Sequence, residues 1–181
     1  MLRITCLILL FLTTPTTQAS KLFWGVSAIS QEISLETSDG INTTSSTDDG
    51  TGFGIYADSY YQNSYRFNGT LSHISYTNFS ISSLTASADY LIPINSQATI
   101  FIGATAGAST QMYSSSGVGD SAFDALYGIQ LGSIMVLTDF IMLEAGYRMR
   151  FTSLETKFTG SPVTTTIDEI NETYLSLVIS L

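Results

Sequence analysis

Seven charged side chains fall on one face of the segments that the sequence predicts to be extended. They are Asp58, Arg66, Asp89, Asp124, Glu144, Arg148 and Arg150. Charges that are removed from water must pair with one another, so we interpret the set as a structural ion network in the protein interior. A gated, narrow conduit lined by the same charges is the alternative. Arg148 and Arg150 are neighbours on this face, and we expect Glu144 and Asp89 to pair with them.

A histidine and a serine stand two residues apart in the segment His73-Ile74-Ser75. On a strand such a pair shares one face and could supply a base and a nucleophile. The pair is similar to that of the PagL-type lipid A deacylases, eight-stranded barrels in which a glutamate orients the histidine, and the resemblance implies His73 and Ser75 as the catalytic pair. The match lies in the third strand and no suitable glutamate follows. We therefore expect an interfacial histidine and no catalytic residue.

The acidic residues of the first predicted loop, 37–50, do not have the spacing of a calcium loop. Asp39, Asp48 and Asp49 lack the Asp-x-Asp-x-Asp-Gly pattern with a later glutamate, and Glu36 precedes them. We expect a solvated external loop, with divalent-cation bridging to lipopolysaccharide phosphates as the alternative. The sequence also lacks a phosphate-binding glycine loop and a metal-ligand cluster, so we expect no metal and no cofactor.

These residues lie on segments in which apolar residues alternate with small or polar ones, and a period of two predicts β-strands. The predicted strands lie near 21–36, 51–61, 64–77, 81–93, 98–113, 122–133, 139–156 and 171–181. Long and short connections alternate along the chain, except at 78–80. Outer-membrane barrels have short periplasmic turns, longer external loops and both chain ends on the periplasmic side, which eight strands provide.

The apolar face of the predicted strands carries two groups of aromatic residues, one near each end of the strands. Such girdles flank the apolar band of a membrane barrel. The periplasmic group is Trp24, Tyr61, Tyr65, Phe67 and Tyr90, and the external group is Phe53, Phe123 and Phe151. The other face combines glycines with a few charges of both signs and almost no lysine, as a narrow barrel interior requires. A soluble β-sandwich with the apolar face inward is the alternative architecture.

The composition fits a lipid environment and excludes some functions. The 181 residues are 44% hydrophobic and only 12% charged, and the net charge is −9. Such an acidic chain repels nucleic acid, so no nucleic-acid partner is expected. No segment approaches the roughly 20 consecutive apolar residues of a membrane-spanning helix.

The first 19 residues read as a secretory signal peptide, with Arg3, an apolar run and a Thr17-Gln18-Ala19 cleavage site. Cleavage before Ser20 would leave residues 20–181 as a single domain of net charge −10, since Arg3 is lost from −9. The only cysteine, Cys6, lies within this segment, so the mature chain forms no disulfide.

The whole pattern from Ser20 to Leu181 resembles the OmpA/OmpX-type eight-stranded outer-membrane barrels. The last strand alternates Leu175, Leu177, Ile179 and Leu181, and this resembles the signal read by the bacterial barrel-assembly machinery. The resemblance implies that machinery, outer-membrane lipid and lipopolysaccharide as partners, a monomer, and a location in the outer membrane of a Gram-negative bacterium. The family's usual terminal aromatic residue is replaced by Leu181, and we expect no peptidoglycan-binding domain after the barrel.

The expected function is that of a non-enzymatic outer-membrane protein with a structural or surface-interaction role, such as envelope integrity or adhesion to an extracellular ligand. Three alternatives remain open: a narrow channel for small or hydrophobic solutes, a lipid A hydrolase that uses His73, and a soluble secreted β-sandwich adhesin.

Overall fold

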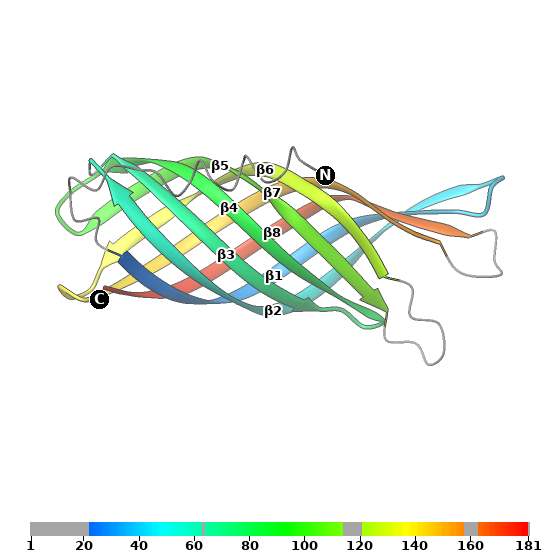
Figure 1. Cartoon of the computed structure of the whole chain (residues 1–181), viewed down its shortest axis with the longest axis horizontal. Coiled ribbons are helices and arrows are strands. Elements are labelled where there is room, and N and C mark those ends of the chain that lie inside the picture. The colour runs from blue at the N-terminus through cyan, green and yellow to red at the C-terminus, as the bar shows by residue number, and fades with distance from the viewer. Residues whose placement is uncertain (1–21, 63, 114–120, 158–162, 181) are drawn as a thin grey trace, which may run out of the picture.

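The chain folds into one antiparallel sheet that closes on itself as a barrel of eight strands (Figure 1). The computed structural model describes residues 22–62, 64–113, 121–157 and 163–180, so the predicted signal peptide and its cleavage site lie outside the described residues. The strands are β1 (Leu22–Ser38), β2 (Thr43–Tyr61), β3 (Tyr65–Ser75), β4 (Phe79–Pro93), β5 (Ala98–Tyr113), β6 (Ser121–Val136), β7 (Ile141–Lys157) and β8 (Thr164–Ser180).

Each strand pairs with the strands before and after it in sequence, and β1 pairs with β8. Closure leaves no open sheet edge along the body of the barrel. The predicted fold class is confirmed, and the β-sandwich alternative is wrong because the eight described strands form a single closed sheet. No helix among the described residues is long and apolar enough to cross a membrane.

Two strands begin well before the positions that the sequence predicts. β2 begins at Thr43 and β8 begins at Thr164, although 37–50 and 157–170 were expected to be loops. Threonine and serine make up most of 43–50, and 164–170 begins with three threonines, a β-branched residue that favours extended backbone. The alternation of apolar and polar residues is absent from these segments, which hid them in the sequence.

Short polar side chains close the turns at both ends of the barrel. Asn95 accepts hydrogen bonds from the backbone amides of Gln97 and Ala98, at 2.8 and 2.9 Å, and so fixes the turn between β4 and β5. At the tip of the β1–β2 hairpin, the Asp39 carboxylate accepts from the amides of Ile41 and Asn42. These amides, Asn42 first, hold the pKa of Asp39 below its ordinary value because they stabilise the charged form.

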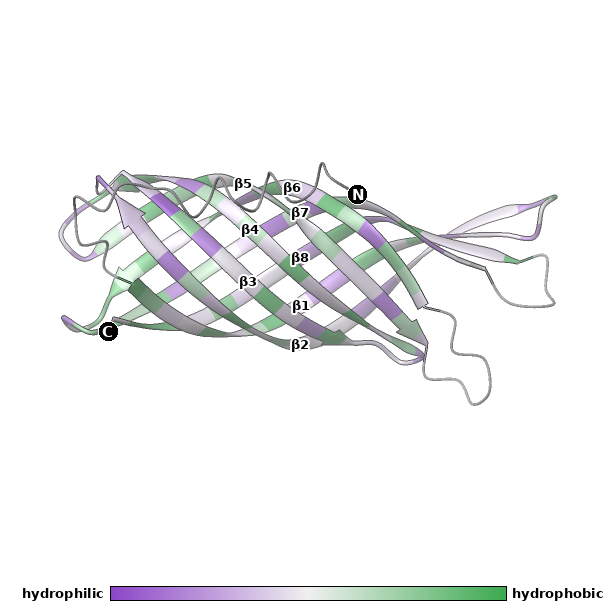
Figure 2. Ribbon diagram, viewed as in Figure 1, coloured by the Kyte–Doolittle hydropathy of each residue, from purple (hydrophilic) through white to green (hydrophobic). Residues whose placement is uncertain are grey.

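Apolar side chains cover the outside of the barrel body. Figure 2 shows apolar and polar residues alternating along most strands. Outward residues are strongly exposed, for example Val26 at 58%, Leu84 at 64% and Phe123 at 74%. Many inward residues of the barrel body, among them Arg66, Thr70 and Asp89, are polar and buried, which is the reverse of a water-soluble protein.

The inside of the barrel changes character toward its external end. Large apolar side chains fill that region, each at most 1% exposed: Ile33, Ile74, Ile81, Leu154, Ile167 and Ile170. On β1, which carries Ile33, the outward positions toward the external end are polar instead of apolar, at Ser30, Glu32 and Ser34. The external part of the barrel is therefore organised like a soluble protein, with apolar residues inside and polar residues outside.

Candidate functional site

The charged side chains inside the barrel form a network with two parts. The lower part, nearer the periplasmic end, is built around Arg66, which is fully buried. Its guanidinium donates to Asp89 at 2.8 Å and to both carboxylate oxygens of Glu144, and it lies 3.5 Å from Asp58. The ring of Phe101 covers the guanidinium, with 4.4 Å between the ring centroid and the Cζ atom. Three carboxylates thus share one cation in a site from which water is excluded.

The upper part of the network pairs two arginines with one carboxylate. Glu172 is fully buried and accepts from Arg148 at 2.7 Å and from Arg150. The expected partners of Arg148 and Arg150 were wrong, because Glu144 and Asp89 both pair with Arg66 instead. Which carboxylate an inward arginine reaches depends on the stagger of the strands around the barrel.

Two neutral side chains connect these clusters into a single network. Gln130 donates to Asp89 at 2.6 Å and accepts from Arg148 at 3.0 Å. Tyr174 donates to Glu144 at 2.7 Å, and its ring lies under the Arg148 guanidinium with a Cζ-to-centroid distance of 4.0 Å. The arginines and carboxylates of the two clusters therefore each gain an opposite charge in place of hydration.

The network continues toward the external end through side chains of β1 and the β3–β4 turn. Gln31 donates to Glu172 at 3.0 Å, and the hydroxyl of Tyr76 donates to Gln31 at 2.6 Å. At the other end, Asn68 donates to Asp58 at 2.8 Å. The second oxygen of Asp58 is buried and has no hydrogen-bond partner among the described residues.

Sequence reasoning missed several members of this network. Glu172 had the right inward parity but was left out of the expected set, and its place next to two arginines became visible only with the strand register. The amide and phenol groups of Gln31, Gln130 and Tyr174 carry no charge, so the search for ion pairs passed over them. Inward parity on each strand is the signal that could have found them.

Asp124 does not belong to the network, although it was expected there. It lies half-buried on β6, and its carboxylate accepts a hydrogen bond from the backbone amide of Ser153 at 2.7 Å. The pairing of β7 with β8 shifts between Phe151 and Leu154, and this irregularity brings the amide to Asp124. The structure therefore brings six of the seven expected charges together and leaves Asp124 apart.

His73 and Ser75 lie on the outward face of β3, near its external end. The Nδ1 atom of His73 is hydrogen-bonded to Ser82 of β4 at 2.9 Å, and its ring lies 6.2 Å from that of Phe53. None of the hydrogen bonds of His73 in the described chain reaches a carboxylate, so the geometry does not assemble a base oriented by an acid.

The aromatic residues expected in two girdles all point outward. Their exposed fractions range from 38 to 74%, as expected for residues of the outer surface. Trp24, Tyr61, Tyr65, Phe67 and Tyr90 lie near the turns at one end, and Phe53, Phe123 and Phe151 lie nearer the opposite end. The rings of Tyr65 and Tyr90 meet edge to face, with centroids 5.6 Å apart.

Solved structures of bacterial outer-membrane proteins share this architecture over most of the chain. Neisserial surface protein A superposes with a TM-score of 0.62 at 18% identity, covering 87% of this chain and 97% of that chain. Outer membrane protein H (OprH) from P. aeruginosa gives 0.60 at 23% identity, covering 89% and 99%. OprG from Pseudomonas aeruginosa gives 0.54 at 10% identity, covering 90% and 97%.

No protein-family model matches the chain, and no curated protein matches it either. The likeness to the solved structures concerns the fold, and it agrees with the outward apolar surface and the inward charges. The chain has the fold of the eight-stranded outer-membrane β-barrels and is similar to Neisserial surface protein A, OprH and OprG.

Proposed function

We propose that this chain is a non-enzymatic protein of the bacterial outer membrane whose external sheet mediates surface interactions such as adhesion. The exposed apolar belt supports the location, since a bilayer core is the solvent that suits an outward apolar surface. The name of Neisserial surface protein A describes a protein of a cell surface, which agrees with the proposal. The external sheet is the observation that most directly supports a role in surface interaction.

Four strands continue beyond the barrel body to form this sheet. Figure 1 shows the β1–β2 and β7–β8 hairpins projecting together from one end. Pairing joins Ser38 to both Thr43 and Thr164, and Thr164 to Lys157. The pairing of β2 with β3 begins only at Thr51 and Ser75. In the described structure, residues 43–50 of β2 therefore form an edge to which another extended segment could add by backbone hydrogen bonds.

The side chains of the sheet suit contact with another molecule in water. Hydroxyl groups and carboxylates cover the edge, at Thr43, Thr44, Ser45, Ser46, Thr47, Asp48 and Asp49. Ile41 at the hairpin tip is 91% exposed and is a large apolar side chain without a packing partner in water. An extended partner with basic side chains would match the acidic edge, and an apolar pocket would accept Ile41.

A shortened hairpin tests this role. Replacing residues 37–44 by Asn-Gly would join the paired residues Glu36 and Ser45 through a tight turn, and it would remove the tip with Ile41 and the two outermost residues of the exposed edge, Thr43 and Thr44. We expect bacteria that display this variant to lose adhesion to host cells, while the barrel still changes its gel mobility on heating. The Asp139→Asn variant, altered in the opposite turn, should adhere like wild type. Unchanged adhesion by a folded shortened barrel would contradict the role.

A further inference from the structure

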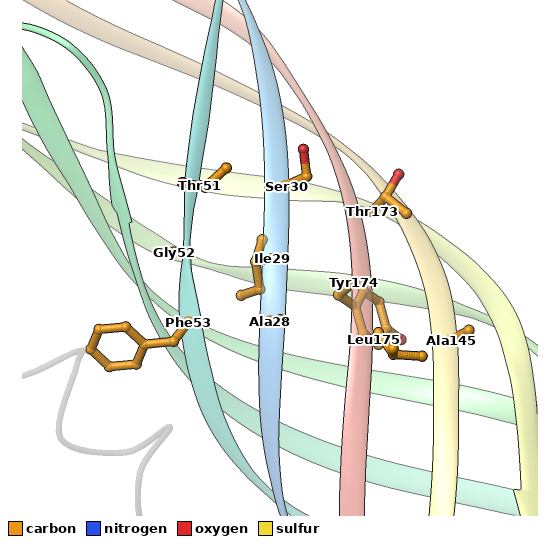
Figure 3. A pocket seen from close by; sticks show the side chains of 10 residues that line it. All are labelled: Ala28, Ile29, Ser30, Thr51, Gly52, Phe53, Ala145, Thr173, Tyr174 and Leu175. Atoms are coloured by element: carbon orange, nitrogen blue, oxygen red, sulfur yellow. The ribbon is translucent and has the colours of Figure 1, made fainter.

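A groove crosses the outer surface of the barrel where the first and last strands meet (Figure 3). Its volume is about 800 Å³, and side chains of β2, β1, β8 and β7 line it. In its first row, Ala28 lies between Phe53 and Leu175, and Leu175 pairs with Ala145. Figure 3 shows the ring of Phe53 turned away from β1. The two alanines leave an apolar hollow at the boundary of the apolar belt.

The groove becomes polar one row further toward the external end. Ser30 pairs there with Thr51 and Thr173, and Thr173 pairs with Tyr147. Ser30 and Thr173 also line a second hollow of about 280 Å³, together with Glu32, Asp49, Tyr147 and Asn171. Because the two hollows share wall residues, they form one groove that changes from apolar to acidic along the strands.

Two carboxylates face each other at the acidic end. Glu32 and Asp49 are direct partners across β1 and β2, and both are exposed. Like charges in directly opposite positions destabilise a sheet. The third side chain of this row, Asn171, already donates to Glu169 at 2.6 Å and accepts from Tyr147 at 2.5 Å. The arginines of the described chain are all buried in the lumen, so none of them neutralises the pair.

We propose that this groove binds an amphiphile with a single alkyl chain and a cationic amine headgroup. The alkyl chain lies over Ala28 and Ala145, and the amine lies between Glu32 and Asp49. The apolar and acidic rows are four residues apart, about 13 Å along a strand, so a molecule must have both parts to fill the groove. An anionic headgroup is repelled there. The inference rests on the membrane location proposed above and does not depend on adhesion.

Charge-removing variants test the acidic end. Dodecylamine, which is protonated at pH 7, is titrated into the barrel in phosphatidylcholine nanodiscs while the alanine methyl NMR signals are followed. We expect saturable shifts at Ala28 and Ala145, and at least tenfold weaker binding to Glu32→Gln/Asp49→Asn. The control Glu36→Gln/Asp168→Asn removes two exposed charges outside the groove and should bind like wild type. An equal loss of dodecylamine affinity in both double variants would show that net charge alone determines binding, and it would overturn the proposal.

Filling the hollow tests the apolar end. Ala28→Leu should weaken binding of dodecylamine severalfold, whereas Ala106→Leu, which enlarges an outward alanine on β5, should not. Dodecanol, the neutral probe, should bind wild type more weakly than dodecylamine does. Tighter binding of dodecyl phosphate with Mg²⁺ would make the site one for a metal-bridged phosphate and overturn the proposal. Changed gel mobility on heating shows that each variant is folded, so a failed groove is distinguishable from a failed membrane assignment.

Discussion

Arg66 is the cation on which the lower network depends. Replacing it with methionine would leave Asp58, Asp89 and Glu144 buried together without a counter-charge. We expect the free energy of unfolding to fall by about 3–5 kcal/mol, as when one partner of a buried ion pair is removed. Urea unfolding in lipid vesicles measures the change. Asp124→Asn, outside the network, should shift it by no more than about 0.5 kcal/mol.

Glu172 permits a sharper test, because two arginines depend on it. Glu172→Gln leaves Arg148 and Arg150 as buried like charges, and we expect a loss of about 3–5 kcal/mol. Removing one arginine as well, in Glu172→Gln/Arg150→Gln, should restore part of that loss, since the remaining repulsion disappears. Additive losses in the double-mutant cycle would show that Glu172 and Arg150 do not interact and would contradict the assigned pairing.

The inward positions of these residues could be predicted from the sequence, but their partners could not. Alternation along a strand fixes the face of each side chain, which is why Arg66 and Glu144 fall in the lumen as expected. Contacts across the lumen depend on how far each strand is staggered against the next. Glu172 was therefore missed, although it lies directly opposite Arg148 in the strand pairing.

At the level of the strands, inward glycines make room for inward aromatic rings. The residue directly across from Gly25 is Tyr56, from Gly132 is Phe101, and from Gly146 is Tyr174. A Cβ atom on any of the three glycines would collide with the opposite ring. These three inward glycines therefore leave space for aromatic rings, and two of the rings, Phe101 and Tyr174, contact arginines of the ion network.

Gly146→Val tests this arrangement. The added side chain would displace Tyr174 from Glu144 and Arg148, and we expect overpacking to cost about 1–3 kcal/mol in the unfolding experiment. Gly69→Ala is the matched control, because a Cβ there meets nothing within 4 Å. If both variants were equally stable, the space that Gly146 leaves for the ring of Tyr174 would not contribute to the free energy of unfolding.

The outer ends of β2 and β8 were the least predictable elements. Apolar alternation arises where one face of a strand meets lipid and the other meets the lumen, and it is absent where both faces meet water. Residues 43–47 are exposed on both faces. In 164–170 the buried Ile167 and Ile170 are three residues apart, because the pairing with β1 skips Asp168, so neither segment shows that signal. Their strand structure depends on pairing with β1, which a single sequence does not display.

The molecule as a whole is built for two surroundings. Within the belt, apolar residues such as Leu84 point outward and charges fill the inside. Beyond the belt, Ile33 and Leu154 fill the inside, and Ser30 and Glu32 point outward. A barrel with apolar residues inside and polar residues outside is stable in water, so this reversal marks where the bilayer ends.

A lumen occupied by this network should not conduct ions. Eight strands enclose a space that side chains fill, and the pairs of Arg66, Arg148 and Arg150 cross it. We expect the purified protein to be silent in planar bilayers under applied voltage. Discrete channel openings whose size changes in Arg148→Ala would favour the transport alternative instead.

The central claim is that the outward apolar face lies in lipid, and Trp24 reports on it directly. Trp24 is the sole tryptophan, lies on the outward face of β1 and is 49% exposed. In vesicles of phosphatidylcholine with brominated acyl chains, its fluorescence should be quenched strongly and acrylamide should have little effect. A Trp24→Phe/Phe101→Trp variant, with the indole in the lumen, should escape the brominated lipid. A monodisperse protein in plain buffer, with Trp24 insensitive to brominated lipid, would contradict the account.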